Sequence, residues 1–356
     1  MIPKMVSKKT TVTIQDVARE AGVSVSTVSR VINDRVDVSS ETREQVHAVI
    51  RRLGYTSSLA ARSMRSTRNN LIGLVVPDIG FPYSIEIMKG INRAIAESSF
   101  DLLLYTTGDI QKANTAAREQ QYVSLLSNSI TDGVIIVASA AESFITNSPI
   151  IAVDPHHIDP DYPSVQGANY QGAVDAMNYL LELGHRRIGF ISGRPEIGSA
   201  RQREKGYRDS LRRAGIEIDE SLIVPGDFTT QTGYRLALSL LQSFDPPTAI
   251  FAANDQSALG VVQAAKELGL EIPDDLSLIG FDNIDETKFM GVTTIDQRLP
   301  EMGYLATQML IKLVKNEPLD VKTYKVPTQL IIRDSCRAVR NPVVHPASEG
   351  GNDRVP

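Results

Sequence analysis

The sequence predicts two structural classes in one chain: a small all-α head of three helices, followed by a larger α/β body with two lobes and parallel sheets. Two observations support this division. Apolar residues recur at helical spacing from Thr11 to Leu53, whereas from Leu71 onward short apolar runs alternate with helical segments. At 356 residues, the chain is long enough for two or three domains with separate cores.

Composition disfavours several classes of protein. The chain is 42% hydrophobic and 22% charged, and no run approaches the roughly 18 apolar residues that a membrane span needs. Its first residues, MIPKMVSKKT, lack the apolar segment of a secretory signal, so we expect a cytoplasmic protein. The single cysteine, Cys336, cannot form an internal disulfide, which fits a reducing compartment. No histidine motif surrounds Cys336, so a catalytic role for its thiol is disfavoured.

The stretch from Thr11 to Asp34 predicts two short helices joined by a tight turn. Thr13 and Asp16 have the spacing of a capping box, so the first helix should start near Ile14. Gly22 marks the turn, because glycine tolerates positive φ.

Ser24 is a good N-cap for a second helix over 25–32, with Val28 on its inner face and Ala18 small enough to let it cross closely. This is the spacing of a helix-turn-helix, whose second helix enters the major groove of DNA. Two helices around a glycine turn also occur in proteins that never bind DNA, so spacing alone leaves both interpretations open.

The charge distribution favours DNA. Residues 1–68 hold 12 Lys and Arg against 6 Asp and Glu, a net +6; because the whole chain carries −5, the remainder carries −11. A basic head on an acidic body is expected when one end neutralises phosphates.

A third helix should complete the head. Ser39 or Ser40 can cap it, its apolar face continues to Leu53, and Gly54 can end it. The next segment, 57–68, is polar and basic, and its centre is too short to be a stable helix alone.

The body shows two successive series of strands and helices. The runs LIGLVVP, DLLLYTT, GVIIVAS and PIIAV form the first series, and RIGFIS, TAIFAA and LSLIGF form the second. Helices are predicted near 85–97, 120–126, 172–183, 201–214, 233–242 and 256–268. Buried strands that alternate with helices imply parallel sheets with right-handed crossovers, and two series imply two lobes.

Ligands of open α/β sheets bind beyond the carboxyl ends of the strands. Polar or aromatic residues that follow a strand are therefore candidates for a pocket: Tyr83, Asp154, Asn254 and Asp282. Arg203 adds a fork of donors and Phe228 a flat apolar face, a combination that suits a sugar. Alternatively, Asp154 or Asn254 satisfies turn amides, and Asp255 is expected to cap the next helix.

The segments VSVSTVSRVIND, VSSETREQVHAVIRRLGY and SSLAARSMRS make the chain resemble the LacI/GalR family of bacterial transcription regulators, and the resemblance extends to about residue 336. It implies that Val25, Ser26 and Arg30 contact bases. It also implies a hinge helix at 57–68 that inserts Met64 into the minor groove, where the family usually has leucine. The complete set of DNA-binding candidates is Thr13, Ser24, Val25, Ser26, Thr27, Ser29, Arg30, Asn33, Ser39, Arg62 and Met64.

For the body, the resemblance implies the type I periplasmic-binding-protein fold, with crossovers between lobes near 165, 295 and 325. The expected divisions are a DNA-binding domain at 1–56, the hinge at 57–68, an effector-binding domain at 69–336 and a disordered tail at 337–356. Arg203, Phe228, Asn254 and Asp282 match the family's effector-contacting positions; Asp154 and Gln297 match weaker ones, and Tyr83 lies where relatives vary.

These observations favour a transcriptional repressor of carbohydrate-utilisation genes that binds a pseudo-palindromic operator as a homodimer and responds to a small sugar. A regulator that responds to a nucleobase or to a phosphorylated partner protein is the alternative, and a transport sugar-binding protein is a weaker one. No enzyme motif is present, no cofactor is expected, and His156 and His157 have no partner at metal-ligand spacing. They are interpreted as loop residues.

Overall fold

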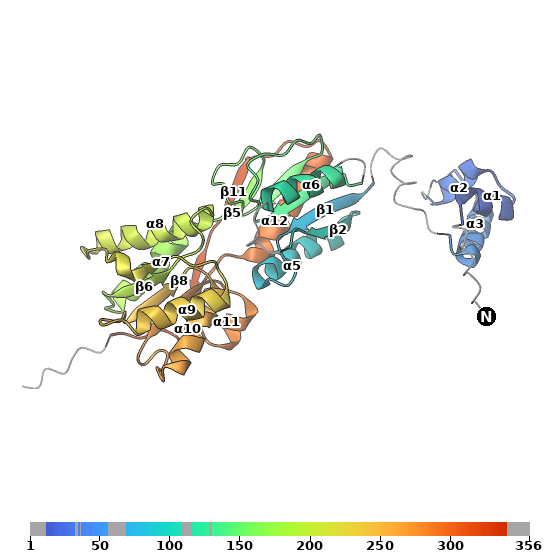
Figure 1. Ribbon diagram of the computed structural model, residues 1–356. Coiled ribbons are helices and arrows are strands. Elements are labelled where there is room, and N and C mark those ends of the chain that lie inside the picture. Colours follow the sequence, from blue (N-terminus) through green and yellow to red (C-terminus); the bar gives the residue numbers. More distant parts are fainter. Residues whose placement is uncertain are drawn as a thin grey trace, which may run out of the picture. The chain divides into compact units, whose positions relative to one another are not determined.

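A computed structural model describes residues 12–32, 35, 37–55, 69–108, 115–127 and 130–339. The chain divides into two compact units, Met1–Asn69 and Asn70–Pro356. The first unit is helical in its described part, and the second carries two sheets with helices (Figure 1). This confirms the predicted fold class.

The head, residues 12–55, contains three helices among its described residues: α1 (Ile14–Glu20), α2 (Val25–Ile32) and α3 (Ser40–Leu53). The predicted capping box is confirmed. The Asp16 amide donates to Thr13 Oγ1 at 3.3 Å, and the Thr13 amide donates to the Asp16 carboxylate at 2.9 Å. The start of α1 is therefore determined by residues adjacent in sequence.

The starts of α2 and α3 and the end of α3 also follow from residues close in sequence. The Thr27 amide donates to Ser24 Oγ at 3.1 Å, and Ser39 caps α3 by accepting from the Thr42 amide at 3.3 Å. Gly54 ends α3 at φ +64°, a left-handed conformation that glycine adopts without strain. The three helices pack around a shared core of Val17, Ala18, Ala21, Val28, Val31, Val46 and Val49.

The first lobe of the body is built on a parallel sheet, which in the described residues has the strand order β11-β5-β4-β3-β1-β2. Its strands are β1 (Leu71–Val76), β2 (Asp101–Thr106), β3 (Gly133–Val137), β4 (Ile150–Val153), β5 (Ser164–Gly167) and β11 (Thr323–Val326). Its helices are α5 (Pro82–Ala96), α6 (Thr115–Ser127) and α12 (Leu299–Val314). Alternate strand residues pack against α5 and α12 on one face and α6 on the other, so both faces are buried.

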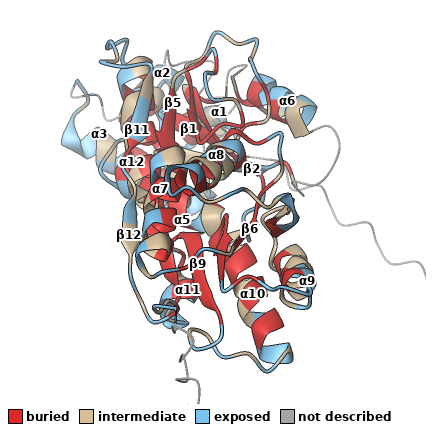
Figure 2. Cartoon of the chain, turned by 90° about the vertical axis from the view of Figure 1, so that its left-hand side faces the viewer, coloured by how far each residue is buried: buried red, intermediate tan, exposed pale blue. Residues whose placement is uncertain are grey.

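The second lobe has the strand order β12-β10-β9-β8-β6-β7 in its described residues. Its strands are β6 (Ile188–Ile191), β7 (Ile223–Val224), β8 (Ala249–Ala252), β9 (Ser277–Asp282), β10 (Thr293–Asp296) and β12 (Gln329–Ile331). Its helices are α7 (Asn169–Glu182), α8 (Gly198–Arg213), the short 3-10 helix η1 (Glu220–Leu222), α9 (Thr230–Leu241), α10 (Asp255–Glu267) and α11 (Asp285–Phe289). Strand β12 runs antiparallel to β10, a departure from the parallel expectation. Figure 2 shows β6 and β9 as fully buried strands.

Within the described residues the chain passes between the lobes at 168, at 297–298 and at 327–328. The first two passages carry the chain from a strand into a helix of the other lobe. The third joins β11 directly to β12. Residues at these passages therefore lie where the lobes meet.

Helix α12 was not predicted from the sequence, although its buried residues between Leu299 and Val314 recur every three or four positions along one face of the helix. It packs closely against α5. A Cβ on Gly90 would lie 1.7 Å from the Pro300 carbonyl oxygen, and one on Gly303 would lie 2.2 Å from the Ile87 carbonyl oxygen. Glycine at both positions is therefore what permits this contact.

The described backbone continues to Val339, two residues beyond the predicted start of the tail at 337. The Arg337 amide donates to Ser277 Oγ at 3.1 Å, and the Val339 amide donates to the Leu183 carbonyl at 2.9 Å. The rest of the predicted tail, 340–356, lies outside the described residues, as does the predicted hinge at 57–68. No helix in the described ranges is long and apolar enough to cross a membrane.

Candidate functional site

The outer face of α2 is the first candidate site. Val28 and Val31 are fully buried in the head core, whereas Val25, Ser26 and Arg30 are exposed. Val25 presents 37% of its surface, although it is apolar. Arg30 Nε lies 3.6 Å from Asp37 Oδ2, but both side chains are more than half exposed, so this pair constrains Arg30 weakly.

The hydroxyl candidates in the head have structural roles at helix starts. Thr13, Ser24 and Ser39 cap the three helices, and Thr27 Oγ1 lies 2.8 Å from Ser24 Oγ. Ser29 lies on α2 between exposed Ser26 and Arg30. The remaining candidates, Asn33, Arg62 and Met64, lie outside the described residues.

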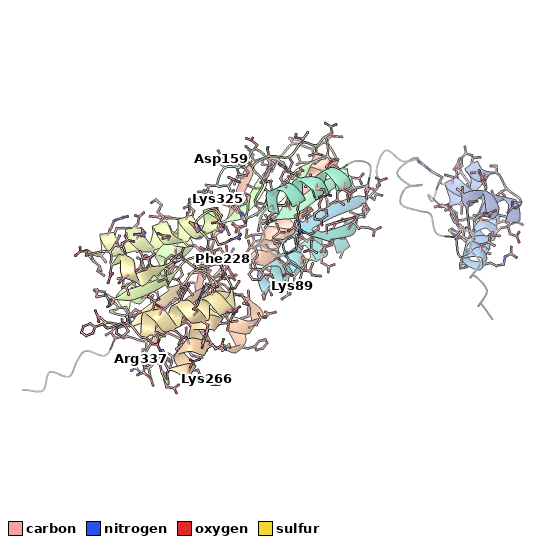
Figure 3. All side chains as sticks on the ribbon, viewed as in Figure 1. Lys89, Asp159, Phe228, Lys266, Lys325 and Arg337 are labelled. Carbon is pink, nitrogen blue, oxygen red and sulfur yellow. The ribbon has the colours of Figure 1, made fainter. Side chains whose placement is uncertain are left out.

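The second candidate site is a cavity of about 180 Å³ between the two lobes. Its lining comes from the carboxyl ends of β1, β3, β4, β6, β7, β8 and β9, together with the first turns of α5 and α8. Figure 3 shows Phe228 at this position between the lobes. Six of the seven predicted pocket residues line the cavity: Tyr83, Asp154, Arg203, Phe228, Asn254 and Asp282.

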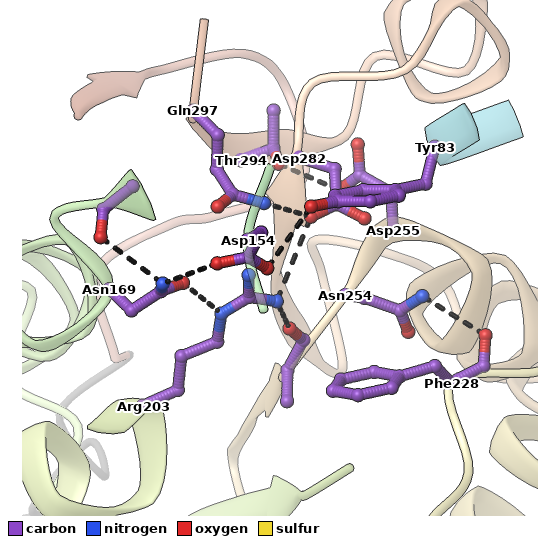
Figure 4. Close-up of polar contacts among 12 residues, drawn as sticks. Tyr83, Asp154, Asn169, Arg203, Phe228, Asn254, Asp255, Asp282, Thr294 and Gln297 are labelled. Carbon is purple, nitrogen blue, oxygen red and sulfur yellow. Dashed lines mark hydrogen bonds and ion pairs between the residues drawn. The ribbon is translucent and has the colours of Figure 1, made fainter. Parts of the chain in front are cut away.

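Arg203 is the centre of the polar cluster (Figure 4). Its Nε donates to Asn169 Oδ1 at 2.9 Å, and its Nη1 donates to the Ala253 carbonyl at 2.5 Å and lies 3.7 Å from Asp282 Oδ1. The guanidinium also lies 3.8 Å from the centre of the Phe281 ring, a cation–π contact. Arg203 is 3% exposed, so these partners rather than water hold its charge.

Asp154 faces Arg203 from the first lobe. It accepts from the Tyr83 hydroxyl at 3.0 Å and from Asn169 Nδ2 at 3.5 Å. Burial raises the pKa of Asp154, and it raises the pKa of Asp282 well above its ordinary value, although Arg203 opposes both shifts. Asn169 begins α7 beside the first passage between lobes, so it links carboxylate and guanidinium where the lobes join.

Phe228 provides an aromatic wall. Its ring lies against Gly193, where a Cβ would come within 2.0 Å of the ring's Cζ. Asn254 Nδ2 donates to the Phe228 carbonyl at 3.0 Å, while Asn254 Oδ1 accepts from the Ser257 amide at 3.0 Å. Asn254 is therefore the cap of α10, and both ends of its amide have protein partners.

The expectation that Asp255 caps this helix is wrong. Asp255 is buried and accepts from the Ile284 amide, Thr287 Oγ1 and Thr294 Oγ1 at 3.0, 2.7 and 2.6 Å. It thereby ties α10 to the segment after β9 and to β10. Burial raises the pKa of Asp255 to about 6.

Gln297, the seventh predicted pocket residue, does not line the cavity. It lies fully buried behind Asp282 and donates to Asp282 Oδ1 at 2.6 Å from its Nε2. Since it occupies the second passage between lobes, its position connects that passage to a pocket carboxylate (Figure 4).

The backbone is strained around the cavity. Ala138, Asp154, Phe228 and Asp282 all line it and all have positive φ, at 51°, 47°, 69° and 124°. Such conformations cost on the order of 1–3 kcal/mol each for non-glycine residues and cluster at functional sites. The strain therefore supports a binding role for this cavity.

Sequence reasoning missed several lining residues, among them Ser84, Asp78, Asp227 and His156. His156 follows β4 by three residues, so its position beyond a strand end could have identified it, but we interpreted it as an ordinary loop residue. No cluster of potential metal ligands occurs in the described part of the chain. The cavity thus offers carboxylate acceptors, guanidinium and imidazole groups, and aromatic faces suited to an uncharged polar ligand with an apolar side.

Family models match both parts of the chain. The model for bacterial regulatory proteins of the lacI family matches residues 13–58, and the model for a periplasmic binding protein-like domain matches residues 177–336. The HTH-type transcriptional repressor CytR of Escherichia coli strain K12 is 35% identical over 344 residues, covering 94% of this chain and 99% of that protein.

Solved structures agree with these matches. A Lac repressor dimer bound to operator and the anti-inducer ONPF is similar with a TM-score of 0.81 at 27% identity, covering 92% of this chain and 100% of that one. A complex of the transcriptional regulator CelR with cellobiose is similar with a TM-score of 0.68 at 28% identity, covering 91% and 99%.

Proposed function

The chain belongs to the lacI family of bacterial regulatory proteins and is a DNA-binding transcriptional regulator rather than an enzyme; from this premise we propose that it is a repressor released or recruited by a small sugar bound between its lobes. We further propose that it acts in the cytoplasm, where chromosomal DNA is accessible. The repressed genes would be those of carbohydrate utilisation.

The outer face of α2 supports the DNA half of this proposal. Val25, Ser26 and Arg30 are exposed together on one helix that packs on the head core through its opposite face. Val25 and Ser26 favour apolar and hydroxyl contacts with bases, and Arg30 can make a bidentate contact with guanine. One such helix contacts few bases, so we propose a homodimer on a pseudo-palindromic operator, as the Lac repressor dimer in the similar structure is bound to its operator.

The observation that carries the sugar half is the buried polar cluster around Arg203. Carboxylates from both lobes face the guanidinium, and the Phe228 ring stands beside them. Carboxylate acceptors and guanidinium donors can hold adjacent hydroxyls, while a ring can stack on the apolar face of a sugar. The cellobiose complex of the similar CelR structure is consistent with this chemistry.

Calorimetry and operator binding together test the proposal. The operator is first selected from random duplexes, and ribose, glucose, lactose and cellobiose are titrated into the DNA-free protein, with adenine representing the nucleobase alternative. We expect one sugar to bind and to change operator affinity.

Asp282→Ala should abolish that response and leave operator binding intact, because truncation removes the carboxylate acceptor of the sugar's hydroxyls and the carboxylate 3.7 Å from Arg203, at about 1–3 kcal/mol or more. A matched control is Asp209→Ala, which removes a carboxylate from the surface of α8 rather than from the pocket. If adenine binds and none of the sugars does, the effector is a nucleobase and not a sugar. An unchanged sugar response in Asp282→Ala would refute the pocket assignment.

A further inference from the structure

The His156 side chain is a buried polar group that faces the cavity without a protein partner. It is 8% exposed and lines the cavity from the loop after β4. Among the residues that the structure describes, none forms a hydrogen bond with its ring nitrogens. Its ring nitrogens are not enclosed by protein atoms, so at the cavity wall they are accessible to a ligand.

Two of its neighbours in the pocket have protein partners, whereas Ser84 Oγ, which also lines the cavity, has none among the described residues. Asp154 accepts from Tyr83, and Asn254 uses both ends of its amide within the protein. Burial and the charge of Arg194 lower the pKa of His156 to about 4, so the ring is neutral at physiological pH. A neutral imidazole has one donor and one acceptor nitrogen, so it can both donate to and accept from hydroxyls of a ligand.

The main chain of the same residue joins the lobes. The Gly198 amide, at the start of α8 in the second lobe, donates to the His156 carbonyl at 2.8 Å. A Cβ on Gly198 would lie 2.6 Å from that carbonyl oxygen and 3.1 Å from Ile158 Cγ1, so the close contact requires glycine. Helix α8 also carries Arg203, and the contact therefore fixes the spacing between the two walls of the pocket.

We propose that His156 is an effector-contacting residue that determines which hydroxyl pattern is accepted, and that its contact with Gly198 couples this recognition to the spacing of the lobes. The inference rests on the proposed function, because it assumes a hydroxylated effector in this cavity. The inference adds to the proposed function an effector contact from the first lobe, made by the His156 side chain. It also adds a link between this contact and the spacing of the lobes, made by the hydrogen bond between the Gly198 amide and the His156 carbonyl.

Three variants test the contact: His156→Ala, His156→Gln and His157→Ala. Glutamine retains a donor group, its amide NH₂, and an acceptor, its carbonyl oxygen. His157 is the matched control, because its Nε2 lies 3.3 Å from the Ala140 carbonyl and it does not line the cavity. Each protein is titrated by calorimetry with the sugar, among ribose, glucose, lactose and cellobiose, that binds the wild type most tightly, and thermal unfolding reports folding.

We expect His156→Ala to weaken binding by about tenfold, His156→Gln to restore most of the affinity, and His157→Ala to behave as wild type. Unchanged affinity in His156→Ala would overturn the inference. So would an equal loss in His157→Ala, which would indicate disturbance of the loop, or a glutamine variant as weak as alanine. If His156→Ala does not fold, the comparison of His156→Gln with the wild type decides. Failure of every sugar to bind the wild type would instead overturn the proposed function and this inference with it.

Gly198→Ala tests the coupling. Alanine is a better helix former than glycine, so a loss of affinity in this variant comes from the contact between lobes and not from α8 itself. We expect weaker sugar binding, and a smaller effect of His156→Ala in the Gly198→Ala background than in the wild type. Strictly additive effects would show that the two parts of the contact act independently and would overturn the coupling.

Discussion

The outer face of α2 and the pocket between the lobes are both recognition surfaces, but they are built in opposite ways. On α2 the candidate residues are exposed, follow one another in sequence and lie on an unstrained helix. In the pocket the candidate side chains are mostly buried, come from segments up to 200 residues apart, and four of the lining residues have positive φ. The head presents its groups to a large partner, whereas the body encloses a small one.

This difference has an energetic consequence. The exposed side chains on α2 have only surface partners to lose, namely the Arg30–Asp37 pair and the 2.7 Å hydrogen bond between the Ser26 and Ser24 hydroxyls, so their replacement should change specificity with little change in stability. A buried group such as Arg203 supports its neighbours as well as the ligand, so its replacement should change both. The four predictions that follow test this contrast.

The largest effect is expected for Arg203→Ala. Removal of the guanidinium leaves Asp282 and Asn169 without their partner, and loss of one member of a buried pair costs about 3–5 kcal/mol. We expect lower stability of the body and no sugar response in calorimetry, with operator affinity retained in gel-shift assays. Arg212→Ala, which removes a surface pair with Asp209, should cost less than about 1 kcal/mol. Equal stability of the two variants would remove the contrast.

The next prediction concerns pH. Burial lowers the pKa of His156 to about 4, below the ordinary value of about 6.5, so the unfolded chain binds this proton first as pH falls. This difference lowers the free energy of unfolding. The loss is absent above about pH 6.5, grows as pH falls, and reaches its full value of about 3 kcal/mol below about pH 4.

His156→Gln removes the titrating group, so its urea unfolding free energy should fall less between about pH 7.5 and about pH 4.5 than that of the wild type, by about 2–3 kcal/mol. Asp154 and Asp282, whose folded pKa values are raised, act in the opposite direction but are present in both proteins and largely cancel. Parallel pH profiles would show that the ring is solvated as a surface residue would be.

A smaller effect, on specificity alone, is expected in the head. Replacement of Val25 and Ser26 together should redirect the preferred operator, with about 1–3 kcal/mol of discrimination at each base pair read. Thermal unfolding should not change, because neither side chain belongs to the head core. Glu44→Ala, on the exposed surface of α3, is the control. An unchanged motif in a selection from random duplexes would contradict the assignment.

The smallest effect is expected for Thr13→Ala. This variant removes the N-cap of α1 and should cost about 1 kcal/mol, seen as faster hydrogen exchange of the α1 amides in the full chain. Gln15→Ala, at an exposed position of the same helix, should have little effect. Because Thr13 is also a candidate DNA contact, a loss of operator affinity larger than this destabilisation would support that second role.

The head could be predicted almost completely from its sequence. All three helix starts follow from caps within three residues of the helix, and the amphipathic pattern identifies Val28 as a core residue. These interactions join residues close in sequence, so local sequence patterns are sufficient to predict where the head helices start and which residues they bury. In the body, the predicted helices start about one to five residues late; in α5 and α8, residues of the first turn line the pocket and do not follow the apolar period.

Other features of the body depended on tertiary structure. Helix α12 was not predicted although its buried residues form one helical stripe, and β7 and β12, at two and three residues, are too short for a strand pattern. Sequence placed Arg203, Asp154 and Asp282 at strand ends or in family motifs. The pairing of Arg203 with Asn169, the position of Gln297 behind Asp282 and the role of Asp255 as an interior link arise from segments that meet only in the fold.

The sequence by itself determined the helices of the head, the alternation of strands and helices in the body, and the residue types available at the strand ends, because each depends on neighbours within a few positions. The tertiary structure decided which of those residues share one cavity and which remain without a partner. His156 shows the reason: its neighbours in sequence give it the character of a loop residue, and its place in a cavity wall depends on the meeting of the two lobes, where the Gly198 amide of α8 donates to its carbonyl.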